Sequence, residues 1–206
     1  MEGDRRVDTI NSEDRGNRLP RAIGRVVSAA IAGWIVLVVV GEFESVGRHF
    51  VILGILRIAL FAALVGLALV ASTHRSRLGL VSLGVAAVGA AANIAGGVGS
   101  VVTDGWNYNP FGAGADVAPP WYAYVIGLSA FIFALGSILS GIAARSAGWL
   151  AVAAVLGGML YPMAIVMQEL YGHDPGDLLG HLIWIAPWLV LALGLSGVGR
   201  SKVSPA

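Results

Sequence analysis

Residues 78–103 read LGLVSLGVAAVGAAANIAGGVGSVVT, and this stretch decides the class of the protein. It contains no Asp, Glu, Lys or Arg, and it exceeds the roughly 20 apolar residues that an α-helix needs to cross a bilayer. Residues 117–144 are equally free of these charged residue types. Apolar runs of this length are typical of transmembrane helices, so the sequence predicts an integral membrane protein.

Four further apolar runs predict, together with these two, an all-α bundle of six transmembrane spans. Apolar types make up 57% of the 206 residues and charged types 12%, whereas a soluble domain carries about 25% charged residues. We expect a disordered cytosolic tail at residues 1–20, a membrane domain at residues 21–199 and a cytosolic tail at residues 200–206. The spans are placed at residues 22–40, 50–73, 78–103, 121–144, 149–170 and 175–198.

Basic residues are distributed unequally between the two sides of the predicted bundle. Eleven of the thirteen precede the first span, separate the second from the third and the fourth from the fifth, or follow the sixth: Arg5, Arg6, Arg15, Arg18, Arg21, Arg25, Arg75, Arg77, Arg145, Arg200 and Lys202. The other two are Arg48 and Arg57. The segments that hold basic residues stay in the cytoplasm by the positive-inside rule. The sequence therefore predicts a multi-pass protein of the cell membrane with both termini in the cytoplasm.

Small residues concentrate in the third span and recur in the fourth. Small side chains at a spacing of four let two helix backbones approach closely, as in Ala92-x3-Gly96 of the third span. We expect the third span to be the central helix of the bundle. The predicted packing residues are Gly84, Gly89, Ala92, Gly96, Gly136 and Gly141.

Two polar side chains inside the predicted spans are the first candidates for function. Arg57 is in the second span, where a charge costs roughly 2.5–3.5 kcal/mol on insertion scales and marks a functional site by default. Its guanidinium either reaches outward to lipid phosphate or turns into the bundle and pairs with an acid, for which we expect Glu169 or Glu42. Asn93 in the third span either bonds to a neighbouring helix or lines a polar pathway.

Further polar candidates lie at the outer ends of the spans. The full set predicted to line a ligand or ion pathway is Arg57, Asn93, Glu42, Asp104, Glu169, Asp177 and His181.

The segment His173 to His181 contains metal-binding residue types, but its pattern is typical of a helix start. Asp174 precedes Pro175, which favours an N-cap with proline at the first helical position, and Asp177 then lies in the first turn. Both acids suit the positive end of a helix. Asp177 and His181 remain a pair on one helix face, and no metal site is predicted.

No cofactor is predicted either. The chain has no cysteine, which excludes thiolate ligands. A haem within the bundle would need histidines that face each other across it, but His49, His74, His173 and His181 all lie at span ends.

One pattern suggests an enzyme. Gly127-Leu128-Ser129 near the outer end of the fourth span and His181 in the sixth resemble the Gly-x-Ser and His dyad of rhomboid intramembrane serine proteases. The resemblance implies a serine nucleophile activated by histidine. Residues 41–49 are too short for the large membrane-embedded loop of that family, and the second span lacks its supporting His and Asn.

Three hypotheses for function follow. The first is binding or transport of a small solute through a polar pocket that faces outward, for which proline within a span (Pro162, Pro187) is common though not specific. The second is a structural or accessory subunit whose Gly/Ala-rich helices bind a membrane-protein partner or a second copy of the chain. The third is an intramembrane hydrolase. The lipid bilayer is an expected partner in all three, and nucleic acid is not.

Overall fold

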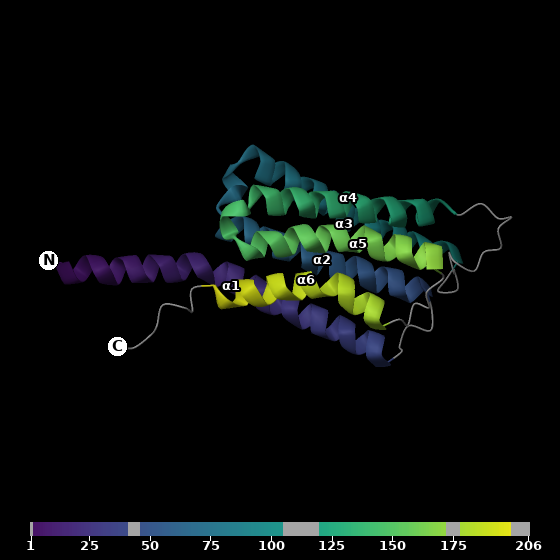
Figure 1. Cartoon of the computed structure of the whole chain (residues 1–206), viewed down its shortest axis with the longest axis horizontal. Helices are drawn as coiled ribbons and strands as arrows, with labels where there is room; N and C mark the ends of the chain where they lie inside the picture. The colour runs from purple at the N-terminus through teal and green to yellow at the C-terminus, as the bar shows by residue number, and fades with distance from the viewer. Residues whose placement is uncertain (1, 41–45, 105–119, 172–177, 199–206) are drawn as a thin grey trace.

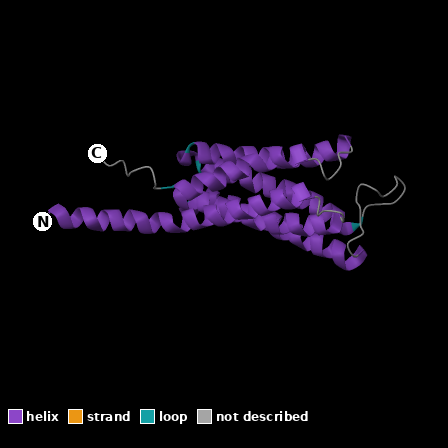
Figure 2. Ribbon diagram, turned by 90° about the horizontal axis from the view of Figure 1, so that it is seen from below, coloured by secondary structure: helices purple, strands orange, loops and turns teal. Residues whose placement is uncertain are grey.

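The structure, a computed structural model, describes the backbone of residues 2–40, 46–104, 120–171 and 178–198, and the side chains of residues 17–40, 51–103, 120–163 and 180–198. Within these ranges the regular elements are all helical (Figures 1 and 2). The α-helices are α1 (Glu2–Val40), α2 (Val46–Val70), α3 (Arg77–Asp104), α4 (Trp121–Ala143), α5 (Trp149–Tyr171) and α6 (Leu178–Gly197). Two short 3-10 turns, η1 (Thr73–Arg75) and η2 (Arg145–Ala147), connect α2 to α3 and α4 to α5.

Each predicted span corresponds to one helix, with ends that differ by a few residues except in α1. This helix begins at Glu2 and so includes most of the segment that we expected to be a disordered tail. The spacing of acids and arginines gives the reason. Glu2 and Arg6, and likewise Asp14 and Arg18, stand four residues apart with the acid first, which is the order that favours a helix.

Five of the described helical segments are long and apolar enough to cross a membrane. They are Asn17–Val40, Val51–Val70, Arg77–Thr103, Trp121–Ala143 and Gly180–Gly197. In α5, the apolar segment with described side chains is the shorter Trp149–Met163. Length and composition thus support an integral membrane protein with several spans.

The helices form a closed ring in chain order. Each helix packs against the next, and α1 closes the ring against α6. At this closure Arg21 donates a hydrogen bond from Nε to the carbonyl of Val198, and a Cβ on Gly24 would lie 2.6 Å from the Ala192 oxygen. The first part of α1 and the last part of α6 therefore lie at the same end of the bundle (Figures 1 and 2).

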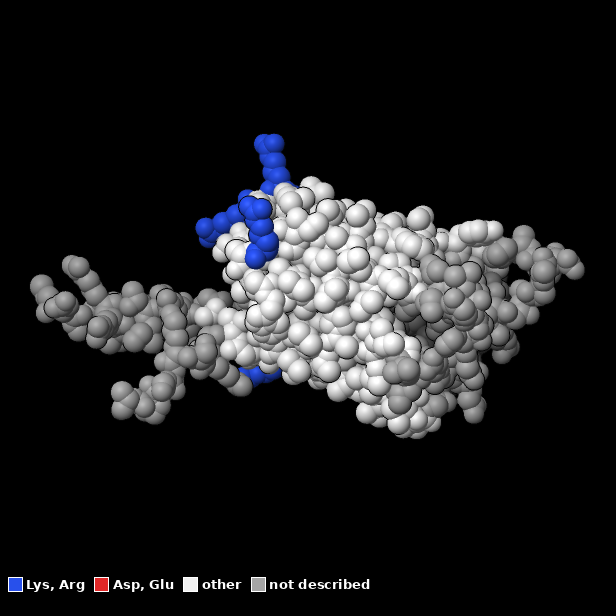
Figure 3. All heavy atoms as spheres, viewed as in Figure 1, with Lys and Arg blue, Asp and Glu red and all other residues white. Residues whose placement is uncertain are grey.

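The basic residues with described side chains, apart from Arg57, gather at that same end. They lie in α1 near its contact with α6, in and beside η1, and in η2: Arg18, Arg21, Arg25, Arg75, Arg77 and Arg145. On the face shown in Figure 3, the rest of the described surface carries no Lys or Arg. We refer to this as the basic end.

The antiparallel pair α3 and α4 makes the closest backbone contact. Steps of three and four residues along α3 are matched by equal steps backward along α4, so that Ala86 faces Gly136, Gly89 faces Phe133 and Gly96 faces Ile126. A Cβ on Gly89 would lie 2.7 Å from the Phe133 Cα, and one on Gly136 would lie 2.7 Å from the Ala86 Cα. Glycine is needed here because any side chain would push the two helices apart.

The other predicted packing residues lie elsewhere. A Cβ on Gly141 would lie 2.7 Å from the Ala151 oxygen, so Gly141 packs against α5. Ala92 is half-buried, beside the α3–α4 contact. Gly84 departs from the expectation, because a Cβ there would meet nothing within 4 Å.

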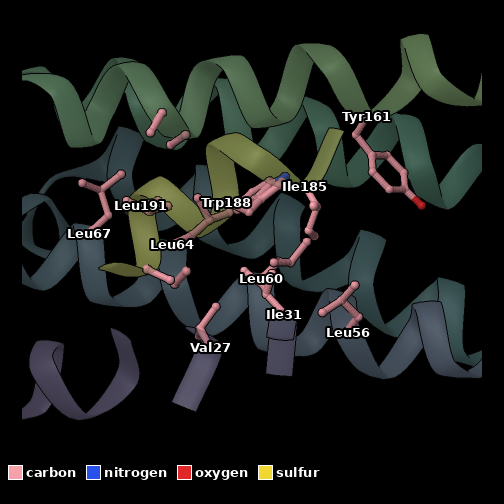
Figure 4. Close-up of a cluster of buried hydrophobic side chains, with 14 of the residues drawn as sticks. Val27, Ile31, Leu56, Leu60, Leu64, Leu67, Tyr161, Ile185, Trp188 and Leu191 are labelled. Carbon is pink, nitrogen blue, oxygen red and sulfur yellow. The ribbon is translucent and has the colours of Figure 1, made fainter. Parts of the chain in front are cut away.

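All six helices contribute side chains to the buried core, and large apolar side chains fill it, among them Leu60 and Leu64 of α2 and Trp188 of α6 (Figure 4). In α2 and α4, 50% of the most apolar 18-residue stretch of the helix is buried inside the protein. In α3 the corresponding share is 33%. The prediction that the third span is central is therefore wrong. Small residues allowed α3 to approach one neighbour closely, but they did not bring it to the middle of the ring.

Candidate functional site

Arg57 lies inside the bundle. It stands 11 residues after the first residue of α2, roughly 16 Å along the helix at 1.5 Å per residue. Its side chain is only 2% exposed, so it does not reach out to lipid phosphate. The guanidinium donates a hydrogen bond from Nη1 to the Ser129 hydroxyl at 3.1 Å. Arg57 Nε is buried without a hydrogen-bond partner among the described residues.

Ser129 of α4 connects Arg57 to Asn93. Its hydroxyl donates to the Ile126 carbonyl at 2.7 Å and accepts from Arg57 Nη1 and from Asn93 Nδ2, each at 3.1 Å. A hydroxyl has one donor and two acceptor lone pairs, so these three bonds use its full capacity. Ser129 is thus the centre of a polar cluster formed by α2, α3 and α4.

Asn93 is the contribution of α3. It is 1% exposed and lies on the α3–α4 contact between Gly89 and Gly96. Its Nδ2 bonds Ser129, whereas its Oδ1 is buried without a hydrogen-bond partner in the described part of the chain. Asn93 thus bonds a neighbouring helix, and it also retains an unused acceptor.

Tyr161 of α5 covers the guanidinium. The Arg57 Cζ lies 4.4 Å from the centre of the Tyr161 ring, which is the geometry of a cation–π contact. The ring also contacts Trp184 of α6, edge to face, with centroids 5.2 Å apart. Tyr161 immediately precedes Pro162, which lies within α5 as the sequence indicated.

The contacts continue to His181 and α1. Trp184 donates a hydrogen bond from Nε1 to His181 Nδ1 at 3.4 Å, and the His181 ring lies 5.8 Å from the Trp34 ring. One layer toward the end of the bundle opposite the basic end thus receives a side chain from every helix. In chain order these are Trp34, Arg57, Asn93, Ser129, Tyr161, His181 and Trp184.

Of the predicted pathway residues, the structure joins Arg57, Asn93 and His181 through this network. The side chains of Glu42, Asp104, Glu169 and Asp177 lie outside the described residues, as do His173 and Asp174. The predicted ion pair between Arg57 and Glu169 or Glu42 stays a prediction.

The bonds of Ser129 do not match those of an activated nucleophile. Such a nucleophile donates its proton to the histidine base. Here the Ser129 hydroxyl donates to the Ile126 carbonyl, and His181 Nδ1 accepts from Trp184. No hydrogen bond joins Ser129 and His181, both of which are described.

Sequence reasoning missed Tyr161, Trp184 and Trp34. The weak signals were the position of Tyr161 directly before a proline within a span and the i, i+3 spacing of His181 and Trp184. Ser129 was singled out only as a nucleophile.

Comparisons of the chain with protein-family models, with curated proteins and with solved structures found no match.

Proposed function

We propose that the protein is a six-span protein of the cell membrane, with both termini in the cytoplasm, that binds and transports a small solute at the cluster of Arg57, Asn93 and Ser129. The solute reaches the cluster from the outer side. One observation carries the proposal: a fully buried guanidinium whose Nε has no partner among the described residues lies next to an amide whose oxygen likewise has none there.

The energetics favour a functional role for Arg57. A charge near the middle of a span costs roughly 2.5–3.5 kcal/mol on insertion scales. A guanidinium has five N–H donors, and the described residues accept from it once, at Ser129. The cation–π contact returns about 2 kcal/mol when desolvated. The cluster thus stabilises the cation only in part, as expected for a site that a ligand completes.

We place the opening of the cluster in α5. Pro162 has no N–H to donate to the carbonyl of Gly158, so the turn that carries Tyr161 lacks one helical hydrogen bond. Gly157 and Gly158 lie in the preceding turn, where a Cβ would lie 2.7 Å from Trp188 Cε2 and 2.8 Å from the Ala134 oxygen, respectively, so this turn packs closely against α6 and α4. Bending at this point moves the ring that covers Arg57.

Single cysteines test access to the cluster, because the chain has no cysteine of its own. Ser129→Cys should react in whole cells with a negatively charged, membrane-impermeant methanethiosulfonate. Ser137→Cys is the matched control. Ser137 is equally buried on α4, eight residues farther toward the basic end, and donates to the Ala154 carbonyl at 2.8 Å. It should not react.

Two surface positions report the orientation in the same assay. Gly112→Cys should label from outside and Ser146→Cys, beside Arg145, should not. The reverse pattern overturns the orientation. If Gly112→Cys labels while neither Ser129→Cys nor Ser137→Cys does, the cluster is closed to the outer solution and the solute-binding proposal fails.

A second candidate function rests on the outer face of α3. Along α4 the exposed positions are bulky, as at Leu128, Phe131 and Leu135. Along α3 the exposed Leu78 and Leu80 lie in the first turn, and the exposed positions beyond them are small or β-branched: Val81, Gly84, Val88, Ala91, Ala95, Val98, Val102 and Thr103. Small residues favour helix association in membranes. This difference supports an accessory role in which α3 binds a further transmembrane helix.

Gly84→Leu tests this alternative, because a side chain there has open space within the chain itself. If α3 pairs with a second copy, the variant should lower the mass measured by light scattering in detergent. An unchanged mass removes the argument for self-association.

A further inference from the structure

The hydrogen-bonding capacity left in the cluster specifies a ligand class. The Ser129 hydroxyl is saturated by Ile126, Arg57 and Asn93. Within the described part of the chain, the N–H groups of Arg57 that do not bond Ser129 and the acceptor Asn93 Oδ1 remain. A ligand that completes the cluster must therefore offer acceptors to a cation and a donor to an amide oxygen.

The free side of the guanidinium suits a carboxylate. Nη1 is directed to Ser129 and the ring face is covered by Tyr161. Nε has no hydrogen-bond partner among the described residues, and the bond from Nη1 to Ser129 is the one hydrogen bond of the guanidinium to them, which leaves the edge formed by Nε and Nη2 for a ligand. This edge presents two parallel N–H groups, which match the two oxygens of a carboxylate.

Asn93 Oδ1 can accept a hydrogen bond from a donor group of the ligand that lies close to that carboxylate. Gly54 lies one turn before Arg57 on α2, and a Cβ there would lie 3.3 Å from Asn93 Oδ1. The amide oxygen is thus held against the same helix that carries the guanidinium. A hydroxyl on the carbon next to a carboxylate would supply the donor within one small molecule.

On these grounds we propose that the solute is a small hydroxycarboxylate anion, with its carboxylate on the Nε–Nη2 edge of Arg57 and its hydroxyl on Asn93 Oδ1. The inference rests on the proposed function. Charge favours this class over an amino acid, because the described part of the cluster carries one positive charge, which an anion neutralises and a zwitterion does not. The packed core on both sides favours a small molecule.

The test is the thermal stability of the purified protein in detergent with four probes of similar size. L-lactate carries the carboxylate and the hydroxyl, propionate lacks the hydroxyl, L-alanine is a zwitterion, and 1,2-propanediol lacks the carboxylate. Lactate should raise the melting temperature most, with an apparent dissociation constant about tenfold lower than that of propionate, since one hydrogen bond separates the two. The diol should give no shift.

Two variants assign the contacts. Asn93→Leu should keep the response to propionate and lose the advantage of lactate over it. Arg57→Lys keeps the charge without the fork, so it should weaken the response to both acids. If either variant fails to fold, the ranking of the four probes on the parent still decides the matter.

The outcomes separate the inference from the proposed function. Equal protection by lactate and propionate, or stronger protection by alanine or the diol, overturns the hydroxycarboxylate while a solute site stands. If no probe shifts the melting temperature and Ser129→Cys still labels from outside, the ligand class is wrong. If that labelling also fails, both proposals fail.

Discussion

Two neighbouring positions of the α3–α4 contact differ in kind. At Gly89 the two backbones touch, and Phe133 of the facing helix fills the core behind them. One turn farther along, Asn93 and Ser129 meet instead, with Arg57 and an unused amide oxygen beside them. The first position is closed and apolar, and the need for close helix packing is enough to explain its residues. The second carries polar groups that packing does not need, and this points to a ligand.

The largest effect is expected at the closed position. Gly89→Leu must separate α3 from α4, because even a Cβ would lie 2.7 Å from the Phe133 Cα. We expect a loss of about 3 kcal/mol of stability or more, seen as a lower melting temperature and poor recovery of folded protein. Gly127→Leu on α4 is the control, since a Cβ there meets nothing within 4 Å. If both variants melt like the parent, this contact does not hold the bundle.

A smaller effect separates two serines of α4. Ser129→Ala removes the acceptor of two buried donors, Arg57 Nη1 and Asn93 Nδ2, which should cost about 1–3 kcal/mol. Ser137→Ala removes a single bond to the Ala154 carbonyl and should cost about 0.6 kcal/mol. Melting temperatures of the two variants measured side by side check the order. Equal losses of stability would mean that the hydrogen bonds of Ser129 contribute no more than an ordinary hydrogen bond between two helices.

The positions of the helices could be predicted because long uncharged runs have few other solutions in a bilayer. The sequence did not, however, predict which face of each helix is buried. A helix that is apolar all round gives no amphipathic signal, so Gly84 and Gly89 look alike in sequence although only Gly89 touches a neighbour.

The candidate site was predicted in part for a related reason. Arg57 and Asn93 stand out because polar groups in spans are costly, and that rule needs no knowledge of the fold. Their partners Ser129 and Tyr161 come from helices far along the chain. An ion pair with an acid was the expected partner for Arg57 because opposite charges are the simplest pairing. Among the described residues, the groups that contact the Arg57 guanidinium are the Ser129 hydroxyl and the Tyr161 ring.

The central claim is that Arg57 is retained for binding and not for stability, and replacing it with methionine tests this most directly. Methionine fills similar space without the charge, so Arg57→Met should melt at or slightly above the parent and should no longer respond to lactate. Arg57→Ala isolates the effect of volume and should lose about 2–4 kcal/mol, because it leaves a cavity beside Tyr161. If Arg57→Met instead melts far below the parent, as Arg57→Ala does, the guanidinium is a structural element of the bundle and the account is contradicted.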